Sequence, residues 1–174
     1  GEVLAHGQVE IERLLLELEA HDIRIEQYDS LSGDDVDFLR AHFHDNIFPL
    51  ITPQSIDSAH PFPFISNLSL NLLVHVRFPD QDKRASLARI KVPLGAGQPR
   101  FIQLPGRNHF VQLEEVIRSN LDMLIPEMEI SSVYMFRATR NANTERNEEH
   151  AEDLLSMIES ELRERRFAPI VRLQ

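Results

Sequence analysis

The sequence predicts an α+β protein with a mixed, largely antiparallel sheet and helices packed on it. Three observations support this fold class. Apolar and polar residues alternate over 68–78, as in a half-buried strand. A strand-like stretch returns at 86–92 after the polar turn 79–84, which indicates a hairpin. Helical spacing of apolar residues recurs near both ends of the chain, over 3–21 and 144–166.

The first part of the chain is predicted to form a helix, a strand and a second helix. Residues 3–21 carry apolar side chains at helical spacing, and 23–28 alternates loosely as a short strand. The second helix begins after Ser32 or Asp34, either of which can accept hydrogen bonds at a helix N-cap, and it runs to about Ile47. Its predicted buried side chains are Val36, Leu39, Phe43 and Ile47.

A proline-rich stretch over 49–64 follows the second helix. It contains four prolines, each of which fixes φ and removes a backbone donor: Pro49, Pro53, Pro61 and Pro63. Large apolar residues stand between these prolines, which is unlike a flexible linker. We therefore expect a rigid loop whose aromatic side chains, Phe62 and Phe64 in particular, pack into the core. The alternative is that these two phenylalanines form a patch that faces a partner.

The remaining elements follow from the same patterns. In order, they are strands over 86–92, 100–104 and 109–113, a helix over 114–125 that ends before Pro126, a strand over 130–140, a helix over 144–166 and a closing strand over 170–173. The length of 174 residues is that of one domain, so 1–174 is expected to be a single domain.

Composition and charge exclude several function classes. The absence of cysteine excludes disulfides, cysteine nucleophiles and thiolate metal sites. No run of eighteen apolar residues occurs, so no membrane-spanning helix is predicted, and the acidic N-terminus lacks the basic start of a signal peptide. The net charge of −10 repels nucleic acid, anionic membranes and phosphate polymers unless a local basic patch overrides it.

Few residues have the spacing that enzymatic or metal chemistry needs. His42, His44 and Asp45, with His60 downstream, form the most metal-like group. Two residues at i and i+2 point about 200° apart on a helix, however, so His42 and His44 are expected to be surface histidines on either side of Phe43. His60 could act as a general base, but a histidine in a proline-rich loop is expected to hold that loop through backbone carbonyls.

Arginines offer a second candidate site, for a phosphate or a carboxylate. Arg137 and Arg140 flank Thr139, and Arg100 and Arg107 could join them. In a chain with 28 acidic residues, pairing of each arginine with a nearby acid is the favoured interpretation. The segment 95–97 lacks the lysine and the following helix of a phosphate-binding loop.

Phe-Pro-Leu-Ile-Thr-Pro stands at 48–53, and His-Pro-Phe-Pro-Phe-Ile-Ser-Asn-Leu-Ser-Leu-Asn-Leu stands at 60–72. These motifs resemble the head domain of bacterial polyphosphate kinase. Further pieces follow in the family's order, at 91–93, 99–101, 113–121, 136–140, 152–155 and 171–173. The resemblance covers nearly the whole chain, and the ordered set is more specific than any one piece.

This resemblance implies a division of labour within a longer parent enzyme. The family transfers the terminal phosphate of ATP reversibly to inorganic polyphosphate through a phosphohistidine, with ATP and magnesium bound outside the head domain. The catalytic residues belong to C-terminal domains, and an N-terminal helical domain helps to hold adenine. None of these parts is expected within 1–174, so the resemblance assigns no catalytic, cofactor-binding or metal-binding residue to this chain.

The resemblance also implies partners and a location. The head domain serves mainly in dimer contacts, so the expected partners are a second copy and the other domains of the same enzyme, with no nucleic acid and no inserted membrane segment. The parent is expected in the cytoplasm, and peripheral association with the inner membrane is left open. The isolated chain is expected to be inactive.

Two alternatives to this function stay open from the sequence. One is a self-contained metal-assisted enzyme that uses His42, His44, Asp45 and His60. The other is a free-standing adaptor that has the same fold without the kinase.

Overall fold

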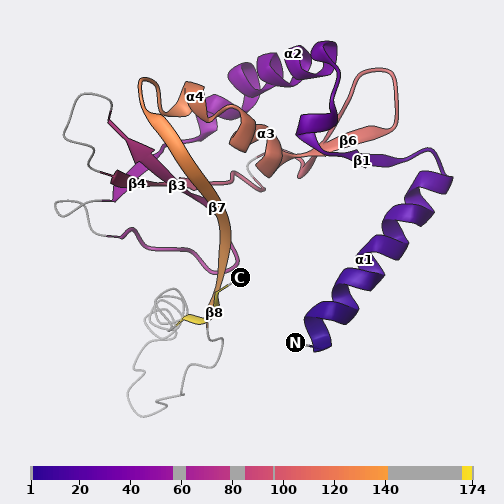
Figure 1. The fold of residues 1–174 in the computed structure, drawn as a ribbon, viewed down its shortest axis with the longest axis horizontal. Helices are drawn as coiled ribbons and strands as arrows, with labels where there is room; N and C mark the ends of the chain where they lie inside the picture. The colour runs from indigo at the N-terminus through magenta and orange to yellow at the C-terminus, as the bar shows by residue number, and fades with distance from the viewer. Residues whose placement is uncertain (1, 57–61, 79–84, 96, 141–169, 174) are drawn as a thin grey trace, which may run out of the picture. The chain divides into compact units, whose positions relative to one another are not determined.

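The computed structural model describes residues 2–56, 62–78, 85–95, 97–140 and 170–173, with the secondary structure shown in Figure 1. These residues form helices and mainly antiparallel strands, which confirms the predicted α+β class. The chain divides into two compact units, one made of Gly1–Thr52 and Pro93–Glu127 and the other of Pro53–Val92 and Met128–Gln174. Each unit is described by itself. Whether both fold together as one domain over 1–174 stays a prediction.

The first unit contains a three-stranded mixed sheet. Its helices and strands are α1 (Glu2–Ala20), β1 (Arg24–Glu26), α2 (Gly33–His42), β5 (Phe101–Gln103), β6 (His109–Gln112), α3 (Leu113–Ser119) and α4 (Leu121–Leu124). The strand order is β1-β6-β5, in which β6 pairs with β1 in parallel and with β5 in antiparallel. The predicted strands on either side of Pro105 and Gly106 are thus confirmed as a hairpin.

Helix α2 begins with the cap that the sequence predicted. The Ser32 hydroxyl accepts a hydrogen bond from the Asp35 backbone N–H at 3.3 Å and donates one to the Asp35 carboxylate at 2.6 Å. Regular α-helix ends at His42, and the chain continues through a π-helical turn at Phe43–Ile47 and a 3-10 turn at Phe48–Leu50. Phe43 and Ile47 in these turns are fully buried, as is Leu39, which confirms three of the predicted core residues, whereas Val36 is only half-buried.

The single helix predicted over 114–125 is wrong, because the chain breaks between α3 and α4 at Asn120. Asn120 has φ −119° and ψ 26°, and it is fully buried. Its side-chain amide donates to the Val116 carbonyl, four residues earlier, at 2.8 Å. A buried amide that bonds the backbone competes with helix continuation, which explains why the break lies at Asn120.

The second unit is a five-stranded antiparallel sheet. Its strands are β2 (Gln54–Ile56), β3 (Leu70–Arg77), β4 (Ala85–Lys91), β7 (Glu129–Arg140) and β8 (Ile170–Leu173). The order β2-β4-β3-β7-β8 places β3 at the centre (Figure 1). The predicted hairpin between 68–78 and 86–92 is confirmed by the pairing of β3 with β4. The helix predicted over 144–166 lies outside the described residues.

The alternation of β3 is confirmed within the strand. Leu72, Val74 and Val76 are buried on one face, at 0–3% exposure. Leu68 does not continue this face, since it precedes the strand, has φ +58° and is 56% exposed. Asn71 departs from the expected pattern because it is fully buried on the other face.

The prediction that the aromatic side chains of 49–64 pack into the core is wrong. Phe62 is 54% exposed and Phe64 is 36% exposed. Phe62 lies against Phe136 with ring centroids 6.4 Å apart, and the Arg140 guanidinium stacks over Phe64 at 4.4 Å. These rings therefore cover the outside of β7 instead of filling an interior. Part of the predicted loop is the strand β2, and 57–61 lie outside the described residues.

We predict that two side-chain truncations in the second unit lower the free energy of unfolding by very different amounts. Leu72→Ala opens a cavity behind the central strand and is expected to lower the free energy of unfolding by about 2–5 kcal/mol. Phe62→Ala removes a half-exposed ring and is expected to cost less than about 1 kcal/mol. Urea denaturation of both variants measures the difference. A loss above about 3 kcal/mol for Phe62→Ala would show that the ring belongs to the core after all.

Candidate functional site

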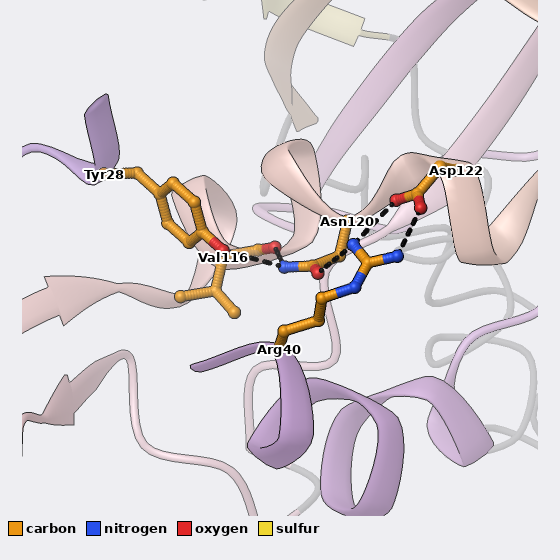
Figure 2. A network of polar contacts seen from close by, with 5 residues as sticks. All are labelled: Tyr28, Arg40, Val116, Asn120 and Asp122. Atoms are coloured by element: carbon orange, nitrogen blue, oxygen red, sulfur yellow. Dashed lines mark hydrogen bonds and ion pairs between the residues drawn. The ribbon is translucent and has the colours of Figure 1, made fainter. Parts of the chain in front are cut away.

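A polar network surrounds the break between α3 and α4 (Figure 2). The Asn120 amide nitrogen donates to the Val116 carbonyl at 2.8 Å and lies 3.5 Å from the Tyr28 hydroxyl. Its amide oxygen accepts a hydrogen bond from Arg40 at 3.1 Å. One buried side chain thus joins the turn after β1, the helix α2 and the end of α3. An asparagine inside a predicted helix is the sequence signal for this network, and our sequence analysis missed it.

Arg40 extends the network toward solvent (Figure 2). Its guanidinium donates two hydrogen bonds to the Asp122 carboxylate, at 2.5 and 3.3 Å. The Arg40 hydrogen bond lowers the pKa of Asp122 below its usual value. The two side chains are 43% and 58% exposed, so solvent screens their attraction and the pair adds little stability. The network positions helices and offers no open chemical group.

Arg100 and Arg107 pair with acids, which confirms the favoured interpretation of these arginines. Arg100 donates to Glu114 at 2.8 Å, and Arg107 donates to Asp35 at 2.6 Å. Both carboxylates are buried, and the hydrogen bonds from Ser32 and Arg107 hold the pKa of Asp35 below its usual value. These two arginines are committed to pairs within the first unit.

Arg137 and Arg140 lie on β7 in the second unit, whereas Arg100 and Arg107 belong to the first unit. Arg140 donates to the Ile65 carbonyl at 3.0 Å and stacks over Phe64. Arg137 lies opposite Leu70 in the β3–β7 register. The contacts described for Arg140 are thus with a backbone carbonyl and an aromatic ring, and the pairing of Arg137 and Arg140 with acids stays a prediction.

Arg89 is a charged residue that the sequence analysis missed. It is only 6% exposed on β4. Its guanidinium donates to Asn71 at 2.8 Å and to Gln54 at 2.5 Å, and both acceptors are neutral amide oxygens. Burial lowers the pKa of Arg89. The two hydrogen bonds join β4 to both of its neighbours, β3 and β2, and so explain why Asn71 is buried.

The histidines of the metal-like group have structural contacts. The His44 ring nitrogen lies 2.8 Å from the Asp45 carboxylate, and its ring stacks on Phe48. The His42 ring stacks on Phe38 with centroids 6.0 Å apart, and its buried Nε2 has no hydrogen-bond partner. Within the described residues, no three His, Cys, Asp or Glu side chains come close enough to hold a metal ion. His60 lies outside these residues.

Helix α1 carries the largest group of exposed apolar side chains in the first unit. They are Val9, Ile11, Leu14, Leu15 and Leu16, which are 40–67% exposed. The sequence predicted apolar side chains at helical spacing on this helix, and Ile11, Leu14 and Leu15 among them are exposed. Among the described helices, none is long and apolar enough to cross a membrane. The α1 side chains are the candidate functional surface.

Comparisons with known proteins identify the family. The family model of the polyphosphate kinase middle domain matches residues 34–174. The chain is 42% identical over 165 residues to polyphosphate kinase of Thermosynechococcus vestitus and 40% identical over 179 residues to that of Mycobacterium ulcerans. These alignments cover 90% and 97% of this chain. The chain therefore belongs to the polyphosphate kinase middle-domain family, as the sequence motifs indicated.

A solved structure agrees with this assignment. The crystal structure of polyphosphate kinase from Porphyromonas gingivalis matches 72% of the chain with a TM-score of 0.64 and 30% sequence identity. The chain spans only 22% of that protein, and 22% and 24% of the two curated relatives. It therefore corresponds to less than a quarter of the length of each of these kinases.

We predict that Asn120→Ala destabilises the first unit by about 1–3 kcal/mol, because it leaves a buried carbonyl and a buried hydroxyl without their partner. Asp122→Asn is the matched control, since it weakens only the exposed end of the same network and is expected to cost less than about 1 kcal/mol. Thermal and urea unfolding measure both variants. Equal losses would mean that the network is stabilised at its surface and not at Asn120.

Proposed function

We propose that this chain is the non-catalytic middle domain of a polyphosphate kinase and that it holds subunits together. The observation that carries the proposal is the exposed apolar surface of α1. A helix with five large apolar side chains in solvent gains free energy when a partner covers it, because burial contributes about 25 cal/mol per Å² of apolar surface. Large exposed apolar patches mark interaction sites in folded proteins.

The sides of α1 are proposed to meet different partners within the parent enzyme. The side of the helix that carries Ile11 and Leu14 is assigned to a second copy of the chain. A stable contact of this kind needs about 800 Å² per partner, so neighbouring residues of the parent are expected to contribute to it. The other domains of the same enzyme are the remaining partners.

The parent enzyme is proposed to transfer the terminal phosphate of ATP to inorganic polyphosphate in the cytoplasm, with ATP, magnesium and the phosphohistidine outside this chain. The names of the curated relatives support the kinase activity of the parent. The net charge of −10 supports a division of labour in which this domain is not the main contact with a polyanion. The engaged side chains of His42 and His44 argue against the metal-assisted alternative.

We expect purified 1–174 to make no polyphosphate from ATP and to hydrolyse no ATP, because the family's catalytic residues have no counterpart in its motifs. Incubation with ATP and magnesium, followed by detection of polymer and of released phosphate, checks this outcome. The full-length parent enzyme, assayed in parallel, is the positive control. Polymer synthesis by the fragment would place catalytic groups within this chain.

The association of the chain is the second test. Sedimentation equilibrium from about 1 to 100 μM is expected to show a monomer–dimer equilibrium. A double substitution of Ile11→Glu and Leu14→Glu introduces charge at the proposed contact and is expected to shift the equilibrium at least about tenfold toward monomer. Asn108→Glu, which adds a charge at an exposed position of the same unit, is the control. A strict monomer at every concentration would contradict the role of this domain in assembly.

A further inference from the structure

A groove of about 400 Å³ lies between the second half of α1 and the strand β1. Neither Ile11 nor Leu14 lines this groove. Its walls carry both apolar and charged side chains: Leu15, Leu16, Ile23 and Ile25 are apolar, Glu12, Glu19 and Glu26 are acidic, and Arg24 is basic. Its size is within the range of ligand and peptide pockets.

One wall of the groove is a sheet edge that pairs with no further strand among the described residues. Strand β1 is the outer strand of the sheet β1-β6-β5, next to β6 (Figure 1). The Arg24 N–H donates to the Asn108 carbonyl, on the β6 side, at 3.1 Å, whereas the Ile23 N–H donates to the Leu18 carbonyl of α1 at 3.0 Å. Backbone groups of consecutive strand residues alternate in direction. The N–H and C=O of Ile25 therefore point toward α1, into the groove.

The charge of the groove selects the chemistry of its occupant. Glu19 has a weak pair with Arg24 at 3.4 Å, and Glu26 lies 2.8 Å from a ring nitrogen of His109. Glu12 makes no ion pair within the described part of the chain. The groove thus presents excess negative charge, which disfavours phosphate and nucleic acid and favours a cationic partner.

We propose that this groove binds an extended protein segment that pairs with β1 as an added strand and alternates apolar with basic side chains. Strand addition to an exposed edge obtains affinity from backbone hydrogen bonds and specificity from alternate side chains. The Ile25 backbone supplies one donor and one acceptor to the segment. The apolar side chains cover Leu15 and Leu16, and the basic ones face the glutamates. This role is additional to the contact between subunits.

Fluorescence anisotropy with chain 1–174 and a labelled synthetic peptide tests the proposal. The probe is the acetylated, amidated pentapeptide Val-Arg-Ile-Lys-Val. Saturable binding is expected, and the charge-reversed peptide Val-Glu-Ile-Glu-Val is expected to bind at least about tenfold more weakly. A probe with an N-methyl group on its central isoleucine keeps every side chain but loses a backbone donor. Its affinity is expected to be at least about fivefold lower than that of the unmethylated probe. Equal binding of the methylated probe would overturn strand addition.

Two matched variants locate the binding. Glu12→Lys reverses a charge at the groove and is expected to lower the affinity for the probe at least about tenfold. Glu10→Lys, at an exposed position of α1 outside the groove, is expected to change this affinity less than about twofold. Circular dichroism checks that both variants fold. Equal effects of the two substitutions, or no saturable binding to the unaltered chain, would overturn the proposal.

Probe binding in the groove can be distinguished from self-association through Ile11 and Leu14. The variant with Ile11→Glu and Leu14→Glu is expected to bind the probe as the unaltered chain does, even when it no longer associates. If the probe instead competes with self-association of the chain, the occupant of the groove is a second copy, and the proposal of a separate basic segment is overturned.

Discussion

The second unit depends on the pairing of β3 with strands on both of its sides. Its register with β4 and with β7 fixes which residues face the interior, because a shift of one residue would turn Leu72, Val74 and Val76 to the opposite face. Burial of each such side chain contributes roughly 1.5–3 kcal/mol. Strand β2 then adds to β4, and β8 adds to β7, so every other strand is placed by the central one.

The hydrogen bonds of Arg89, on the opposite face of the sheet from Leu72, depend on the same strand register. Arg89 is 6% exposed as a residue, so its guanidinium loses hydration, and hydrogen bonds to neutral amide oxygens compensate only part of that free energy. The pKa of Arg89 is lowered for this reason. Asn71 and Gln54 can meet the guanidinium only if β3 and β2 pair with β4 in the observed register. The buried charge therefore penalises other registers more strongly than an apolar residue would.

The sequence was a good guide where local pattern and tertiary packing agree. The alternation of β3, the Ser32 cap and the hairpin of β5 and β6 were all predictable, since each depends on neighbours in sequence. Asn120 and Arg89 were not predicted, because their partners are distant in sequence and only the fold brings them together. Phe62 and Phe64 were misassigned for the related reason that hydrophobicity alone does not distinguish a buried ring from one that covers a strand.

The candidate surfaces on α1 could be predicted only in part, because leucine spacing defines an apolar side of a helix but not what covers it. Physical chemistry separates the two proposed occupants by charge. Two copies of a chain with net charge −10 repel each other, so their contact depends on apolar burial and is strengthened when salt screens the repulsion over about 10 Å at 0.1 M. A basic segment is attracted by the glutamates of the groove, and salt weakens this attraction. The two proposals therefore predict opposite salt dependences for the two sides of one acidic helix.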